Sequence, residues 1–265
     1  MVGHTKVVLS DIDQTLIVNG EINDYPILLS HKISKLRQHG IFFSLISGRD
    51  LPFEKNLYKK LAEKKHMKDY EALIYEENCV QLGNGKNYIT RGINKEQLSK
   101  INHLYVEEPE LFNGLVFLPN SKFTIRAGWV TEEFALNKPT NEFVLSLRYP
   151  EIKSYIEQHF TNIQVGRSAD GIDVISKNSD KTVGLTKYLD ILKKEFKLSP
   201  KEVLVIGDSF NDLNALEQIL RLGGKAGFVG TNINLQEKLA SQGAYIPKSK
   251  GPLGTLETLN HFFFN

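Results

Sequence analysis

The chain has 265 residues, enough for one large domain or two modest ones. Its hydrophobic fraction of 41% and charged fraction of 24% are ordinary for a globular protein, and a net charge of +2 is too small to indicate a nucleic-acid or membrane-surface partner. The single cysteine, Cys79, excludes an internal disulfide and a cysteine-based zinc site. We see no signal segment and no apolar run long enough to cross a bilayer, so we expect a soluble, cytoplasmic protein.

The first third of the chain alternates short apolar runs with amphipathic segments. The pattern predicts strands at 7–10, 41–46 and 72–75, separated by helices at 25–39 and 50–65. This β-α-β-α-β order is typical of a parallel, doubly wound sheet.

The pattern changes after a hairpin predicted around the Gly83-Asn84-Gly85 turn. From there to residue 176 we expect an α+β insertion that forms a second domain. Its predicted helices are 94–106, 131–136 and 151–160. Its predicted strands are 115–118, 122–126, 143–147, 163–165 and 172–175.

The α/β alternation returns near residue 181. Helices are predicted at 182–196, 213–222, 235–241 and 253–264, and strands at 203–206, 226–229 and 244–246. We therefore predict an α/β protein whose Rossmann-like core, a doubly wound parallel sheet, comprises residues 1–82 and 177–265. Residues 83–176 form a smaller α+β domain inserted in it.

Polar side chains follow three of the predicted core strands. They are Asp11 and Asp13, then Ser47, and finally Asp208 and Asp212. Ligands in open α/β sheets gather outside the carboxyl ends of the strands. Acidic groups that meet there are costly to bury unless a positive group, such as a metal ion, lies between them.

Four motifs occur in order on these elements: D-I-D-Q-T from Asp11, L-I-S-G-R around Ser47, Lys181 at the start of a helix, and G-D-S-F-N-D around Asp208. The set resembles the haloacid dehalogenase superfamily, over the whole chain. The segment K-G-P-L-G-T from Lys250 is also similar to a loop near the site in that family, and the insertion resembles the large cap of its sugar-phosphatase-like branch. The resemblance implies a phosphotransferase that acts on a small phosphate ester.

The resemblance also implies a role for each matching residue. Asp11 is expected to be the nucleophile that forms an aspartyl-phosphate, and Asp13 the general acid and base. Lys181 is expected to offset negative charge, and Ser47 to bind phosphate oxygens. A Mg²⁺ cofactor is expected on Asp11, Asp13, Asp208, Asn211 and Asp212. Further candidates for substrate contact are Thr15, Gly48, Arg49, Arg126 and Arg148.

Two positions depart from the family pattern. Gln14 stands where relatives usually have glycine, and Asn78-Cys79 stands where many have Asn-Gly. We expect altered local packing at both sites and unaltered catalysis.

Other readings of these residues stay open. Each motif alone could be an ordinary turn or helix cap, and Lys181 could be a surface lysine. The chain could also be a phosphosugar mutase of the same fold, or a protein that binds a phosphate ligand without turning it over. The lysine-rich segment 55–65 could contact a polyanion, although a solvated helix face explains it better. The predicted partner is a small phosphate ester, not a nucleic acid or a membrane, and the sequence leaves the oligomeric state unknown.

Overall fold

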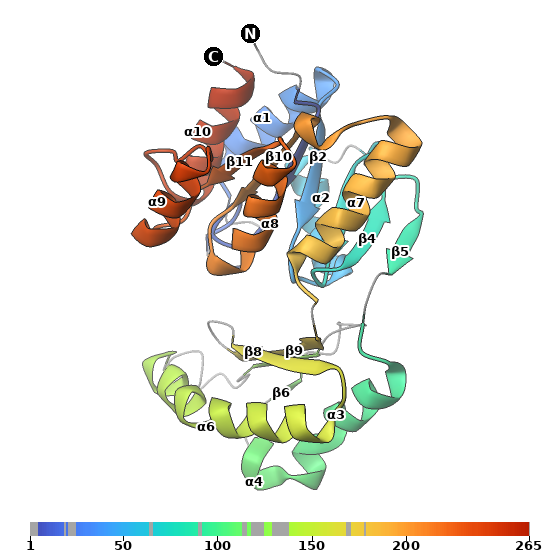
Figure 1. Cartoon of the computed structure of the whole chain (residues 1–265), viewed down its shortest axis with the longest axis vertical. Coiled ribbons are helices and arrows are strands. Elements are labelled where there is room, and N and C mark those ends of the chain that lie inside the picture. The colour runs from blue at the N-terminus through green and yellow to red at the C-terminus, as the bar shows by residue number, and fades with distance from the viewer. Residues whose placement is uncertain are drawn as a thin grey trace. The chain divides into compact units, whose positions relative to one another are not determined.

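The computed structural model describes residues 5–18, 20, 25–63, 66–89, 92–112, 116–117, 125–128, 138–167, 171–177 and 179–264. The chain divides into two compact units (Figure 1). The larger unit contains Met1–Thr90 and Asp180–Asn265, and the smaller unit contains Arg91–Ser179. The strand Asn87–Ile89 (β5), which we placed in the insertion, belongs to the larger unit because it pairs with the strand Cys79–Leu82 (β4).

The larger unit is built on a seven-stranded sheet with the order β11-β10-β1-β2-β3-β4-β5. Neighbours from β11 to β3 pair in parallel, and β4 and β5 are added antiparallel. The other strands are Val7–Ser10 (β1), Phe42–Ile46 (β2), Ala72–Tyr75 (β3), Val203–Gly207 (β10) and Lys225–Phe228 (β11). The predicted α/β class and mostly parallel sheet are confirmed.

Helices cover both faces of this sheet. Val7 and Leu9 of β1 belong to the apolar core with the first set of helices, whereas Val8, which points to the opposite face, belongs to the core with the second. The first set is Lys181–Phe196 (α7), Phe210–Arg221 (α8) and Ile233–Ser241 (α9). The second set is Ile27–Gln38 (α1), Leu51–Leu61 (α2) and Gly251–Phe263 (α10). A short 3₁₀ turn at Pro200–Glu202 precedes β10.

The smaller unit has a four-stranded antiparallel sheet with the order β6-β7-β9-β8. Its strands are Val116–Phe117 (β6), Ile125–Gly128 (β7), Ile163–Arg167 (β8) and Gly171–Ser176 (β9). Its helices are Lys95–Glu107 (α3), Pro109–Phe112 (α4) and Lys138–His159 (α6). The unit has an apolar core of its own, which includes Ile101, Phe112, Ile156 and Val174.

Two sequence expectations differ from this arrangement, and a third lies beyond the residues that the structure describes. The strand predicted at 143–147 is wrong, because those residues lie within the long helix α6. A short apolar run is compatible with either a strand or a buried helix, so periodicity could not decide between them. The strand predicted at 244–246 is reduced to an isolated bridge between Tyr245 and Gly227. The helix predicted at 131–136 lies outside the described residues.

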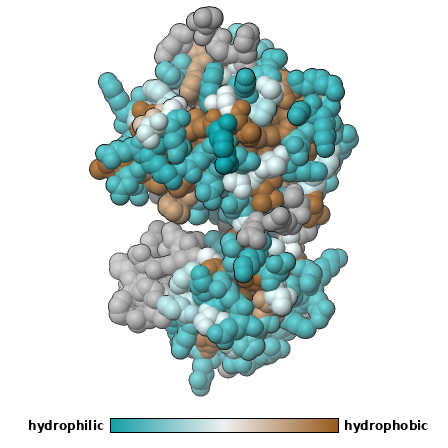
Figure 2. Space-filling model, viewed as in Figure 1, coloured by the Kyte–Doolittle hydropathy of each residue, from teal (hydrophilic) through white to brown (hydrophobic). Residues whose placement is uncertain are grey.

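Among the residues that Figure 2 colours by hydropathy, hydrophilic ones predominate on the visible face of each unit, with hydrophobic residues in scattered patches. Among the helices of the described ranges, none combines the length and the apolar character needed to cross a membrane.

Candidate active site

The first acidic motif forms a tight turn at the carboxyl end of β1. The Asp11 backbone N–H donates to the carbonyl of Ile206 in the neighbouring strand β10, which fixes the buried Asp11 at the sheet edge. The Thr15 hydroxyl lies 3.3 Å from Asp11 Oδ2 and 3.2 Å from Asp208 Oδ1, so it links the two carboxylates. Gln14 has a φ of 56°, a left-handed conformation that glycine adopts most easily. This explains the usual glycine at that position.

Asp212 contacts both the candidate site and the backbone at the start of α8. Its Oδ2 accepts hydrogen bonds of 3.0 Å from the backbone N–H groups of Asp208 and Ser209 and from the Ser209 hydroxyl. Ser209 and Asp212 form a capping box, so Ser209 caps the helix. Gly207 permits this packing, because a Cβ there would lie 2.5 Å from the Asp212 side chain.

Lys181 contacts acidic residues from two separate segments, Asp11 after β1 and Asp212 on α8. Asp180 caps the N-terminus of α7, and the buried Lys181 ammonium at the start of that helix lies 2.5 Å from Asp11 Oδ1 and 2.6 Å from Asp212 Oδ1. Because an ammonium is disfavoured at a helix N-terminus, the two carboxylates are what stabilise it there. Lys181 therefore belongs to the acidic cluster and is not a solvated surface residue.

Asp11, Asp208 and Asp212 each offer one oxygen, and these oxygens lie within 4.8 Å of one another. Three carboxylates against the single ammonium of Lys181 leave a net charge of −2 when all are ionised. A hard divalent cation prefers carboxylate oxygens and would neutralise that excess. The donor set therefore fits Mg²⁺.

Burial and the excess of negative charge together shift the pKa values of the cluster. Burial, followed by repulsion from Asp212, raises the pKa of Asp208 to about 6. Burial and then Asp212 also raise the pKa of Asp11 well above its usual value, against the opposing effect of Lys181. Burial would lower the pKa of Lys181, but attraction by Asp11 and Asp212 raises it overall.

Ser47 lies at the end of β2, where its backbone N–H donates to Ile74 of β3. Its hydroxyl accepts a hydrogen bond of 2.9 Å from the Arg49 backbone N–H, across the half-buried Gly48. The same hydroxyl lies 2.8 Å from Oε1 of Glu54, a fully buried side chain on the first turn of α2. We did not single out Glu54 from the sequence, because an acidic residue in a first helical turn normally complements the helix dipole.

Asp13 lies apart from the acidic cluster. Its carboxylate is held by the Arg49 guanidinium through hydrogen bonds of 2.9 and 2.8 Å, and 42% of its side chain is exposed. Asn211 is exposed on the first turn of α8, and within the described part of the chain no hydrogen bond joins its side chain to the cluster. The cluster thus gathers Asp11, Thr15, Lys181, Asp208 and Asp212, but neither the Asp13 carboxylate nor Asn211.

Two further candidates belong to the smaller unit. Arg126 lies on β7, and its side chain is outside the described part of the structure. Arg148 is half-buried on α6.

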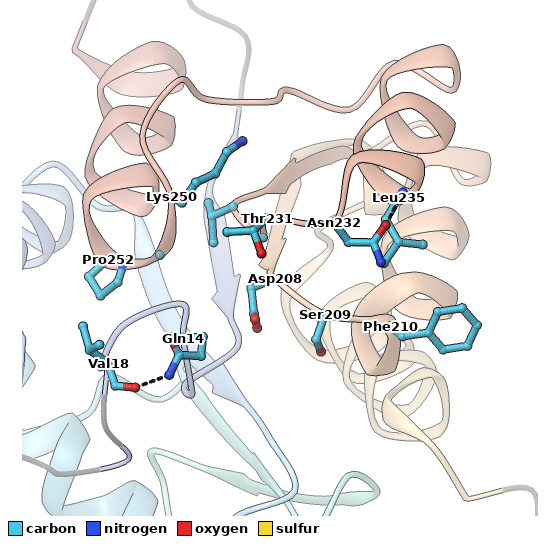
Figure 3. Close-up of a pocket in the computed structure, with 13 residues that line it drawn as sticks. Gln14, Val18, Asp208, Ser209, Phe210, Thr231, Asn232, Leu235, Lys250 and Pro252 are labelled. Atoms are coloured by element: carbon cyan, nitrogen blue, oxygen red, sulfur yellow. Dashed lines mark hydrogen bonds between the residues drawn. The ribbon is translucent and has the colours of Figure 1, made fainter. Parts of the chain in front are cut away.

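A pocket of about 440 Å³ adjoins Asp208 in the larger unit (Figure 3). Apolar side chains such as Val18, Leu235 and Pro252 line it together with polar ones such as Asn232 and Lys250. The segment from Lys250 that we singled out begins α10 at this pocket. It also supports the first motif, because the buried Thr255 hydroxyl donates to the Thr15 carbonyl at 2.7 Å.

The fold and the sequence are similar to those of known hydrolases. The family model of haloacid dehalogenase-like hydrolases matches residues 8–221. A haloacid dehalogenase-like hydrolase from Bacteroides thetaiotaomicron is 15% identical, with a TM-score of 0.70, and the match covers 98% of this chain and 100% of that one.

Two other solved structures are similar over comparable lengths. TM0651 from Thermotoga maritima is 17% identical with a TM-score of 0.66, covering 98% of each chain. BT1666, described among the phosphatases of the superfamily in B. thetaiotaomicron, is 16% identical with a TM-score of 0.62, covering 97% of this chain and 95% of that one. No curated protein matches the chain. Because the family model covers most of the sequence, the protein belongs to the haloacid dehalogenase-like hydrolases.

Proposed function

We propose that the protein is a Mg²⁺-dependent phosphatase that hydrolyses a small phosphate monoester through an aspartyl-phosphate on Asp11. The observation that carries the proposal is the contact of Lys181 with both Asp11 and Asp212 beside Asp208, at the carboxyl ends of neighbouring strands. Phosphoryl transfer requires alignment and charge neutralisation more than covalent work by the protein, and this cluster is suited to both.

The first step uses Asp11 as the nucleophile. Its carboxylate oxygen forms a bond to phosphorus while the bond from phosphorus to the leaving alcohol oxygen breaks. Lys181 favours the ionised form of Asp11, against burial and Asp212, and offsets the charge of the incoming phosphate. Bound Mg²⁺, held by Asp11 and Asp208 with Asp212 in support, would supply further neutralisation of the phosphate charge. Ser47 would donate a hydrogen bond to a phosphate oxygen.

Asp13 is proposed to give a proton to the leaving alcohol. In the second step it would take a proton from the water that attacks phosphorus, and the bond to Asp11 then breaks to release phosphate. Since Arg49 holds the Asp13 carboxylate on both oxygens, at least one of those hydrogen bonds must open for Asp13 to carry a proton. Arg49 would thus control how Asp13 reaches the substrate.

We further propose a phosphorylated sugar or sugar derivative as the substrate. The resemblance to the sugar-phosphatase-like branch supports this class, and the similarity to BT1666 supports only the phosphatase reaction. Arg126 and Arg148 of the smaller unit remain candidates for contact with the sugar.

The test is phosphate release from a panel of sugar phosphates, nucleotides and simple phosphate esters, with Mg²⁺ or with a chelator. We expect metal-dependent release from the wild type and a loss of at least about a thousandfold in Asp11→Asn. The matched control, Asp190→Asn, changes an exposed carboxylate on α7 and should keep full activity.

Activity that survives in Asp11→Asn would refute the role of Asp11 as the nucleophile. An inactive wild type would refute hydrolysis. Transfer of phosphate between sugar hydroxyls, seen only when a bisphosphorylated sugar is added, would identify a mutase instead.

A further inference from the structure

Glu54 is a buried acid that the proposed reaction does not use. Its side chain has 0% exposure, and its Oε1 lies 2.8 Å from the Ser47 hydroxyl. Within the described residues, its Oε2 has no hydrogen-bond partner. No ion pair to Glu54 is found in that part of the chain either. Buried carboxylates are normally paired with a cation or several donors, so this environment is unusual.

The hydroxyl of Ser47 can make three hydrogen bonds, one as a donor and two as an acceptor. The Arg49 backbone N–H already occupies one acceptor position. If Glu54 were ionised, the Ser47 hydroxyl would donate its hydrogen to Glu54 and could not donate it to a substrate. If Glu54 is neutral, its own hydrogen can fill the second acceptor position, and the Ser47 hydrogen remains free.

The surroundings favour the neutral acid. The charged groups that act on Glu54 are Asp11 at the end of β1, Asp50 at the start of its own helix, and Lys181 at the start of α7. Lys181 is already bonded to Asp11 and Asp212. Asp11 and Asp50 repel a negative charge on Glu54. Burial is the largest effect, and it raises the pKa of Glu54 well above its usual value, although the Ser47 hydrogen bond opposes the rise.

We propose that Glu54 is a positioning residue whose neutral carboxyl donates a hydrogen bond to Ser47 Oγ and leaves the Ser47 hydrogen free for a phosphate oxygen. This inference rests on the proposed function for the phosphate site, and its test is chosen so that it can be decided without turnover.

The first measurement is the dissociation constant of inorganic phosphate in the presence of Mg²⁺. Glu54→Met removes the donor but keeps the volume, and phosphate binding should weaken about tenfold, the effect of one hydrogen bond to a charged group. Glu54→Gln keeps a neutral donor and should recover most of that loss. In a Ser47→Ala background, Glu54→Met should weaken binding no further, because the group that Glu54 positions is gone.

Protein stability provides a contrast with a purely structural role. Glu54→Met removes a buried oxygen that has no hydrogen-bond partner among the described residues. The melting temperature should therefore stay level or rise while phosphate binding weakens. A variant that loses stability and phosphate binding together, with no recovery in Glu54→Gln, would overturn the positioning role.

The second measurement is the infrared difference spectrum between wild type and Glu54→Gln at neutral pH. We expect the carbonyl band of a protonated carboxylic acid, shifted by deuteration. Carboxylate bands in its place would overturn the proposal. A wild type that binds no phosphate would overturn it as well, whereas one that binds phosphate but hydrolyses no ester would refute only the proposed function.

Discussion

Individual carboxylates of the site differ in how much the sequence reveals about them. Asp11 and Asp208 could be predicted because each follows a buried apolar strand. The motif around Asp208 could also have been a helix cap, and Asp212 in fact takes part in one. Its Oδ2 completes the capping box of Ser209 at the start of α8, while its Oδ1 binds Lys181. The pairing of Asp13 with Arg49 could not be predicted, because it depends on how two loops meet.

Removing the ammonium of Lys181 should destabilise the protein. Lys181→Met leaves Asp11 and Asp212 buried without their cation, so we expect the free energy of unfolding to fall by about 3 kcal/mol in a chelating buffer. Added Mg²⁺ should restore part of the loss. Denaturant unfolding measures the effect, with Lys193→Met on the exposed side of the same helix as the control. Equal stability of the two variants would contradict the prediction.

The raised pKa of Asp208, about 6, predicts a pH dependence of stability. Its usual value is 3.8, so between about pH 4 and pH 6 the folded state holds a proton that the unfolded state has lost. In a chelating buffer, the contribution of Asp208 to the unfolding free energy should therefore fall by about 2 kcal/mol as the pH rises through this window, and then level off.

The measurement for Asp208 is the difference in unfolding free energy between wild type and Asp208→Asn at several pH values. With saturating Mg²⁺ the trend should weaken or reverse, because the cation requires the ionised carboxylate. A difference that does not vary from pH 4 to pH 6 in the chelating buffer would show that Asp208 titrates normally.

At the scale of the elements, strands with continuous apolar runs were predicted well, whereas the extent of the long helix α6 in the smaller unit was not. The core strands are buried on both faces, and their ends coincide with polar motifs, so their positions are fixed by composition. In the smaller unit, no polar motif marks the end of the apolar run at 143–147, which is part of the helix α6. Pro150 also lies inside that helix. A proline within a helix is tolerated only when surrounding packing compensates, which no local pattern reveals.

Several elements of the larger unit meet at one buried carboxylate. Glu71 accepts hydrogen bonds of 2.7 and 2.9 Å from the Arg37 guanidinium of α1. It also accepts from the Tyr58 hydroxyl of α2 and from the Phe43 backbone N–H of β2. This network ties two helices to the sheet on the face opposite α7.

Arg37→Met should therefore lower the free energy of unfolding by about 3 kcal/mol, because Glu71 would keep its burial and lose its cation. Thermal or denaturant unfolding measures the change. The control is Lys55→Met, an exposed cation on α2 that should alter stability by less than about 0.5 kcal/mol. A loss below 1 kcal/mol in Arg37→Met would mean that the other donors suffice for Glu71.

At the scale of the whole molecule, the acidic cluster and Lys181 come entirely from the larger unit, although the smaller unit interrupts it in sequence. The existence of an insertion could be predicted from the change in pattern after β3. The start of the insertion could not be predicted. The turn at Gly83–Gly85 has the same sequence pattern whether the following strand joins the large sheet or begins a new one.

This separation predicts that the proposed metal site survives removal of the insertion. Replacing residues 91–179 by a short Gly-Ser linker should leave a folded protein that binds Mg²⁺ within about threefold of the full chain, since each unit has its own apolar core. Calorimetric titration measures the affinity. An Asp208→Asn version of the shortened chain serves as the control and should bind Mg²⁺ much more weakly.

The position of β1 between β2 and β10 also determines when the enzyme can be completed during protein synthesis. Val7 of β1 pairs with Val203 of β10, so one edge of β1 has no partner strand until β10 is translated, nearly 200 residues later. At ordinary elongation rates this delay is about 10 to 40 s. During that time the apolar edge of β1 is open to pairing with another chain. Because β10 also brings Asp208 and Asp212, no ribosome-bound chain can assemble the acidic cluster before this edge has closed.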